Sequence, residues 1–293
     1  MKKIFLFLAF FLFETNAFAE VTIFACEPQW GSLAREIVGQ KSRVLNGTAS
    51  NVDPSTIRVT TDLTNTLRTA QMVFCNGGGL EISWLDIALN KSSNLTVLTR
   101  PENLLFAYDF ALTKTSPYVH LNPNNILPIA AEFTRRIKII DGLNAAYYQK
   151  SYEAFATKWQ KSLVAWQSAA VPLRGMRVVV QNDNWSELIN WTGMEIAAKI
   201  PLQDTRLANN KLLEETLRTL KAEPANIIIV SNIEDKKSAL WLSAQAKTRV
   251  VLLPFTVGAA ANSSDLFLMF STTLNSLRTD CSKVACAPIA IAN

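Results

Sequence analysis

The amino-acid sequence predicts an α/β protein with two lobes, each a parallel sheet flanked by helices, joined by one long linking helix and separated by a cleft. Two observations lead to this prediction. Short apolar runs typical of buried strands alternate with helical patterns in both halves of the chain. Between the halves, residues 144–171 contain no Gly and no Pro, which favours one uninterrupted helix. We therefore expect lobes over residues 20–143 and 172–293 and a linking helix over 144–171.

The linking stretch has the period of one helix face. Its large apolar side chains recur at steps of three and four residues, at Tyr148, Tyr152, Phe155, Trp159, Leu163 and Trp166. Asn144 is a suitable N-cap, and Pro172 prevents the helix from continuing. Such a helix between two α/β halves indicates a spine for both lobes, although an ordinary long helix within one domain would show the same period.

Each half contains four short apolar runs separated by helical patterns. In the first half we expect strands at 21–25, 42–45, 72–75 and 95–98, and helices at 31–38, 62–70 and 80–89. In the second half we expect strands at 176–180, 195–200, 227–230 and 250–253, and helices at 185–191, 212–220, 238–246 and 265–277. Residues 100–128 are expected to cross between the lobes as a loop-rich segment. Ligands of such folds bind beyond the carboxyl ends of the strands, in the cleft.

The N-terminus has the pattern of a secretory signal peptide. Lys2 and Lys3 precede an apolar run at 4–13, and a small-x-small cleavage pattern follows at 17–19. The apolar run is short for a membrane span. We expect residues 1–19 to be cleaved after export to a bacterial periplasm; the alternative is a retained anchor helix.

The charge distribution argues against nucleic-acid binding. The chain has 29 Lys and Arg against 24 Asp and Glu, a net charge of +5. The basic residues are scattered, and the only notable pairs are Arg135 with Arg136 and Lys236 with Lys237. A solvated surface explains these pairs better than a nucleic-acid interface does.

Four cysteines suit an oxidising compartment. Cys281 and Cys286 are close together in the C-terminal tail, and we expect them to form a local disulfide. Cys26 and Cys75 each end an apolar strand-like run. If these strands are neighbours, a second disulfide can form there; two buried free thiols or a thiolate site are the alternatives.

Several strings, in order, carry a resemblance to a known family. They are Asp53-Pro54, the stretch 72–81 (MVFCNGGGLE) followed by Trp84-Leu85, the stretch 117–123 (PYVHLNP), and the long helix. The chain resembles the zinc/manganese class of solute-binding proteins of ABC transporters over nearly its whole mature length. This resemblance implies two α/β lobes joined by a rigid helix, a metal ion bound in the cleft, and delivery to a membrane permease.

The chain departs from the family at each of the four positions that carry the family's metal ligands. Ser55, Tyr118, Asn182 and Leu253 stand at these positions. Zinc is bound mainly by imidazole, thiolate or carboxylate, and manganese by carboxylate and imidazole. A hydroxyl, a phenol, an amide and an aliphatic chain make a poor site for either ion. The resemblance therefore implies the fold but not the family's usual metal site.

Other side chains could form a different site in the cleft. Cys26, Glu27, Cys75 and His120 would suit a soft ion, although a Cys26–Cys75 disulfide without metal is the favoured alternative. Asp183 is a further cleft candidate that would equally suit a small polar ligand.

Two other cleft features do not point to catalysis. His120 is the only histidine, and no G-x-S-x-G string accompanies it. Gly77 to Gly79 lack the Gly-Lys-Ser/Thr of a phosphate loop.

We therefore expect a periplasmic, monomeric solute-binding protein that is not an enzyme and binds no nucleic acid. Its partners would be a metal ion or small solute and the membrane permease of an ABC transporter. Zinc is the candidate cofactor, although the usual four-ligand site is lacking. The alternatives are a non-metal ligand, a soft metal bound by other cleft residues, or a ligand-free module that binds a partner protein.

Overall fold

Two parallel four-stranded sheets form the centre of the molecule, with strand orders β2-β1-β3-β4 and β6-β5-β7-β8. The computed structural model describes residues 20–201 and 206–279. The first sheet contains β1 (Val21–Ala25), β2 (Ser42–Asn46), β3 (Met72–Cys75) and β4 (Leu104–Phe106). The second contains β5 (Arg177–Val180), β6 (Glu195–Lys199), β7 (Ile227–Ser231) and β8 (Arg249–Leu253). The predicted α/β class with two parallel sheets is confirmed.

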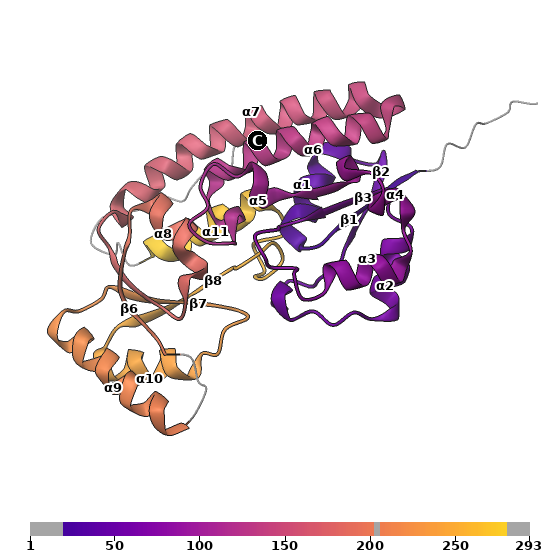
Figure 1. Cartoon of the computed structure of the whole chain (residues 1–293). Coiled ribbons are helices and arrows are strands. Elements are labelled where there is room, and N and C mark those ends of the chain that lie inside the picture. The colour runs from indigo at the N-terminus through magenta and orange to yellow at the C-terminus, as the bar shows by residue number, and fades with distance from the viewer. Residues whose placement is uncertain (1–19, 202–205, 280–293) are drawn as a thin grey trace, which may run out of the picture.

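Helices cover both faces of each sheet. Those of the first lobe are α1 (Pro28–Val38), α2 (Thr61–Arg68), α3 (Leu85–Ser92), α4 (Leu95–Leu98), α5 (Ala107–Phe110) and α6 (Ile126–Ile140). Those of the second lobe are α8 (Ser186–Thr192), α9 (Arg206–Ala222), α10 (Lys237–Ala246) and α11 (Leu266–Arg278). The long helix α7 (Ala145–Ala170) runs along both lobes (Figure 1).

The helix α7 packs against α1 and α6 of the first lobe and against α11 of the second. Trp159 and Trp166 on its buried face belong to one apolar cluster that continues through both lobes. Asn144 occupies the N-cap position, but its side chain makes no capping hydrogen bond and donates instead to Asp141 Oδ2 at 2.8 Å. The predicted long helix is confirmed, and the tertiary contacts of its apolar face stabilise it.

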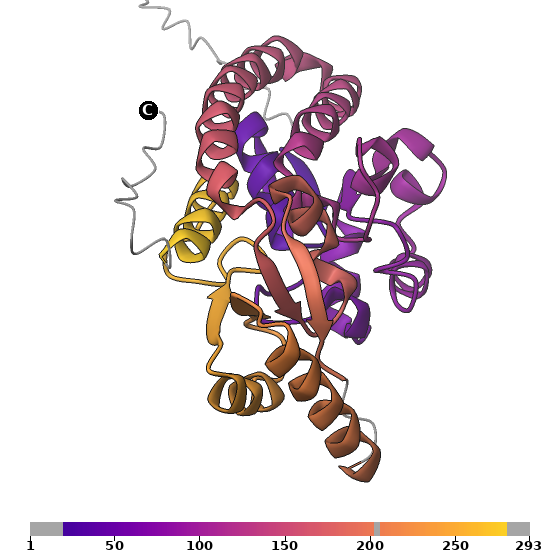
Figure 2. The same cartoon turned by 90° about the vertical axis from the view of Figure 1, so that its left-hand side faces the viewer.

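On the outer face of each sheet, the covering helices form an apolar core that is separate from the large central cluster. Leu63 and Leu67 of α2 and Leu85 of α3 pack on Phe24 and other residues of the first sheet. In the second lobe, α9 and α10 cover the face of the sheet that lies away from α7, as the turned view in Figure 2 shows. No helix within 20–201 or 206–279 is both long and apolar enough to cross a membrane.

Two expectations for the first lobe were wrong. Residues Leu95–Leu98 form the short helix α4 rather than a strand, because the Asn94 side chain accepts a hydrogen bond from Val97 N and caps the turn. The fourth strand is instead β4, at Leu104–Phe106, inside the segment expected to be a loop-rich crossing. Arg136 Nη1 donates to Leu104 O at 2.6 Å, so this member of the basic pair anchors the edge strand rather than lying on a solvated face. The predicted signal peptide and the predicted Cys281–Cys286 bond lie outside the described residues.

Candidate functional site

The segments that follow the strands of both sheets meet in the cleft between the lobes. Cys26 and Glu27 directly follow β1, and Asn76 follows β3. In the second lobe, Asn182 follows β5 and Phe255 lies just beyond β8. This is the edge at which open parallel sheets bind ligands, so the cleft is the candidate site.

Aromatic side chains from both lobes fill the floor of the cleft. Tyr118 meets Phe255 edge to face, with ring centroids 4.7 Å apart. His120 Nε2 lies 2.9 Å from the carbonyl oxygen of Phe255, and His120 Nδ1 lies 3.4 Å from Gln29 Nε2. Because the Gln29 amide nitrogen can only donate and a carbonyl can only accept, the ring is the neutral tautomer with its proton on Nε2. Thr256 Oγ1 extends this series of hydrogen bonds by donating to Gln29 Oε1.

Very little space remains beside these rings. The pocket lined by Glu27, Tyr118, His120 and Phe255 has a volume of about 10 Å³. About one water molecule needs that much room. The floor of the cleft is therefore a packed contact between lobes rather than an open ligand chamber.

A wider pocket of about 230 Å³ lies next to this floor. Asp53 of the first lobe lines it together with Glu234 and Asp235 of the second. Its remaining lining residues come from the second lobe and are Gln181, Asn182, Asn184, Ile200, Pro201, Ile233 and Ser238. We call this space the mouth pocket. Its polar lining consists mainly of carboxyl and carboxamide groups, which suits a polar ligand.

The four positions that match the family's metal ligands lie in different surroundings. Tyr118 lines the floor pocket, and Asn182 lines the mouth pocket. Ser55 is exposed, and its Oγ donates to Asp53 Oδ1 at 2.7 Å. Leu253 is 1% exposed and belongs to the apolar core. Ser55 and Leu253 line neither of these two pockets.

The structure brings together Cys26, Cys75 and Glu27 of the other candidates, and it places His120 and Asp183 elsewhere. Cys26 and Cys75 form a disulfide across β1 and β3, which settles the alternatives left open by the sequence in favour of the bond. His120 lies apart from them, against Phe255. Asp183 is exposed and pairs with Lys199, with 2.6 Å between Oδ1 and Nζ.

Two buried carboxyl groups lie beside the disulfide, and only one of them, Glu27, was a predicted site residue. Glu27 is 2% exposed and Glu81 is 3% exposed. The backbone N–H of Asn76 donates to both, at 3.1 Å to Glu27 Oε2 and 2.7 Å to Glu81 Oε1. Burial raises the pKa of both carboxyl groups, and the neighbouring Glu81 raises that of Glu27 further. Glu81 occurs in the string that carries the family resemblance, but nothing in the sequence placed it beside Glu27.

The buried His120 gives a testable pH dependence. Burial lowers the pKa of His120 to about 4, from its ordinary value of 6.5. Below pH 6.5 the unfolded chain therefore binds a proton at this residue that the folded chain does not bind. We expect the free energy of unfolding to fall by about 1–3 kcal/mol between pH 6.5 and pH 4 from this group. Urea unfolding of the wild type and His120→Gln at both pH values measures it.

The comparison of the two proteins isolates the contribution of His120. The raised pKa values of Glu27 and Glu81 act in the opposite direction, because these groups bind protons more readily in the folded state. They are present in both proteins and cancel in the difference. Equal losses of stability on acidification in the wild type and His120→Gln would contradict the prediction.

A match to a protein-family model shows which family the chain belongs to. The family model described as "Zinc-uptake complex component A periplasmic" (ZnuA) matches residues 23–280. The chain belongs to the ZnuA family. This is the metal-type class of ABC-transporter solute-binding proteins that the sequence resembles, so the predicted class is confirmed. No curated protein matches the chain significantly in sequence.

Solved structures share the fold of this ZnuA-family chain at low sequence identity. A crystal structure of ZnuA has a TM-score of 0.71 and 18% identity, covering 87% of this chain and 98% of that one. A zinc-bound ZnuA deletion mutant gives 0.71 and 18%, with coverages of 88% and 98%. A manganese-bound periplasmic metal-binding protein from Candidatus Liberibacter asiaticus gives 0.71 and 11%, with the same coverages. At these identities the likeness shows a common fold.

Proposed function

We propose that this chain is a periplasmic solute-binding component of an ABC transporter whose family metal position does not hold Zn(II) or Mn(II). In this proposal residues 1–19 are removed on export, the mature chain acts as a monomer, and it delivers its cargo to a membrane permease without chemical change. The observation that carries the proposal is the pair of aromatic rings, Tyr118 and Phe255, which leave about 10 Å³ at the floor of the cleft.

The atoms available as metal ligands at the four family positions support the same conclusion. A zinc site needs three or four imidazole, thiolate or carboxylate ligands that act together. Tyr118 would have to bind as a phenolate, but burial first and the nearby Asp53 and Glu27 carboxyl groups next raise its pKa far above the ordinary value. Leu253 offers no donor atom, and the Ser55 hydroxyl already donates to Asp53. The affinity for Zn(II) and Mn(II) is therefore expected to be low.

The mouth pocket supports a second candidate function, the capture of a small polar solute. Its lining comes from both lobes, so a bound solute would bridge them. Asp53, Glu234 and Asp235 would favour a cationic solute over an anionic one. In this function the chain keeps the family's transport role but carries a different cargo.

Calorimetry on the oxidised protein tests whether the family's metal position binds Zn(II) and Mn(II) only weakly. The wild type is expected to bind Zn(II) and Mn(II) at least about 100-fold more weakly than a variant with Ser55→His, Tyr118→His, Asn182→His and Leu253→Asp. Because Leu253 is in the core, a triple variant without its replacement is the folding control, and circular dichroism checks both variants. Tight one-to-one Zn(II) binding by the oxidised wild type would refute the proposal.

A further inference from the structure

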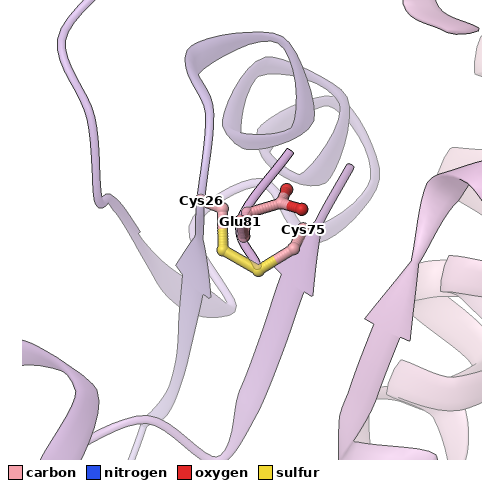
Figure 3. A group of neighbouring side chains, drawn as sticks. All are labelled: Cys26, Cys75 and Glu81. Carbon is pink, nitrogen blue, oxygen red and sulfur yellow. A yellow bond between two sulfur atoms is a disulfide. The ribbon is translucent and has the colours of Figure 1, made fainter. Parts of the chain in front are cut away.

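Three ligand atoms gather at the carboxyl ends of β1 and β3. The sulfur atoms of Cys26 and Cys75 and a carboxylate oxygen of Glu81 lie within 4.8 Å of one another, and all three residues are buried. Figure 3 shows the Glu81 carboxylate beside the disulfide. Within 20–201 and 206–279, no other set of three His, Cys, Asp or Glu residues is grouped in this way.

The backbone places these groups together without help from the disulfide. Because β1 and β3 are parallel neighbours with Ala25 opposite Phe74, the next residues, Cys26 and Cys75, are adjacent. The turn after β3 returns Glu81 to the same place, and its carboxylate accepts hydrogen bonds from the backbone N–H groups of Asn76 and Gly77. Gly77 has φ +77°, a left-handed conformation that a side chain would strain. Reduction of the disulfide therefore leaves the three groups next to one another.

A fourth donor atom, from Glu27, lies next to this group and outside its 4.8 Å limit. Glu27 Oε2 accepts a hydrogen bond from Asn76 N at 3.1 Å, while Glu27 Oε1 is buried and has no hydrogen-bond partner. Such an orphaned carboxylate oxygen is costly in a protein interior. A divalent cation beside Glu27 and Glu81 would satisfy this oxygen.

We propose that the reduced protein binds one soft divalent ion of the Zn(II) type through Cys26, Cys75 and Glu81, with Glu27 as the fourth ligand. Donor atoms around tetrahedral Zn(II) lie about 3.4–3.8 Å from one another. The cluster is close enough to reach this spacing by side-chain rotation. Two thiolates with carboxylate oxygens are ligands that Zn(II) accepts. The site uses none of the family's four metal positions.

The disulfide and the ion exclude each other. A dithiol reductant transfers two electrons and two protons to the Cys26–Cys75 bond and becomes a disulfide itself. The two thiols then lose their protons as the ion binds. In the reverse step, a disulfide oxidant takes two electrons from the thiolates and two protons from water and becomes a dithiol, the Cys26–Cys75 bond re-forms, and the ion is released. Metal binding at this place is therefore controlled by redox state.

The surroundings give the ion a route to the cluster. Glu81 lines a surface pocket of about 280 Å³ together with Gly77, Asp86 and Asp109. The sulfur atoms themselves are fully buried, since Cys26 and Cys75 are both 0% exposed. The ion therefore meets Glu81 first, whereas a reductant reaches the disulfide only when the chain opens.

The test compares oxidised and reduced forms of a mature protein that carries Cys281→Ser and Cys286→Ser, so that Cys26 and Cys75 are its only cysteines. The reduced form is prepared by unfolding with a phosphine reductant and refolding without oxygen. Competition with a chromophoric chelator is expected to show one Zn(II) per chain, bound at least about 100-fold more tightly than by the oxidised form. Co(II) in place of Zn(II) is expected to give a thiolate-to-metal charge-transfer band only in the reduced form.

Variants identify the ligands. Glu81→Gln is expected to weaken Zn(II) binding by the reduced form at least about 10-fold, and Glu195→Gln, which changes an exposed carboxylate of the second lobe, is expected to leave it unchanged. The Co(II) spectrum of the protein without Cys281 and Cys286 needs no change at Glu81, so the test does not depend on whether Glu81→Gln folds. Absence of the thiolate band, or equal Zn(II) affinity in both redox forms, would overturn the proposal. Tight binding by the oxidised form would instead contradict the proposed loss of the family's metal position.

Discussion

Trp159→Ala is expected to lower the free energy of unfolding by about 3–5 kcal/mol, the cost of removing a large buried aromatic side chain. Trp159 is 0% exposed, and its ring contacts the rings of Trp166, Phe267 and Phe270. Its Nε1 also donates to Pro123 O at 3.0 Å. The substitution therefore leaves a cavity between α7 and α11 and removes one hydrogen bond to the first lobe, where Pro123 O still accepts from Ile126 N.

Urea unfolding followed by circular dichroism measures this loss. Trp159→Phe keeps an aromatic ring and loses the hydrogen bond, so its effect is expected to be smaller, about 1–2 kcal/mol. Val164→Ala, at a 65% exposed position of the same helix, is the matched control and is expected to change stability by less than about 0.5 kcal/mol. A loss below about 1 kcal/mol in Trp159→Ala would contradict the role of α7 as the spine of both lobes.

Glu187→Ala is expected to destabilise the protein by about 2–4 kcal/mol, because it removes a buried acceptor that joins the lobes. Glu187 is 0% exposed and belongs to α8 of the second lobe. Its Oε2 accepts from Thr113 Oγ1 at 2.6 Å, and its Oε1 accepts from Thr115 N at 2.5 Å. Without the carboxylate, both donors of the first lobe lose this acceptor, and Thr113 Oγ1 retains Asn125 Oδ1 at 3.3 Å.

Thermal and urea unfolding compare Glu187→Ala with two controls. Glu187→Gln keeps one acceptor oxygen and is expected to recover part of the loss. Glu195→Ala removes an exposed carboxylate from the same lobe and is expected to stay within about 0.5 kcal/mol of the wild type. If Glu187→Ala unfolds like Glu195→Ala, the hydrogen bonds across the lobes do not contribute to stability.

The regular parts of the fold were predictable because their signals are local. The long helix shows an apolar period without Gly or Pro, and most strands are continuous apolar runs next to helical patterns. The segment at Leu95–Leu98 is only four residues long, and at that length an apolar run does not distinguish a strand from a helical turn. The edge strand β4 has three residues and is held by Arg136 from a distant helix. Contacts of this kind leave no local pattern.

The candidate site was less predictable than the fold. Cys26 and Cys75 were expected to lie side by side only if their two strands are neighbours in the sheet. The residues of the two strands do not show the order of strands, so the sequence left this pairing open. The closed floor depends on Phe255, whose carbonyl is 135 residues from its partner His120. Glu81 was visible as part of a motif, while its contact with Glu27 depends on the turn after β3. Packing between distant segments therefore determines what the cleft can hold.

The location of the disulfide also affects how the protein acquires it. Cys26 and Cys75 are the first two cysteines of the chain, and the next one is Cys281. In the proposed export, in which the N-terminus of the chain leaves the membrane translocon first, these two thiols emerge long before any other thiol can compete for them. The first partner that Cys26 meets is its native one, so oxidation in the order of emergence gives the correct pair without later reshuffling. The first lobe can thus be cross-linked while the second is still being exported.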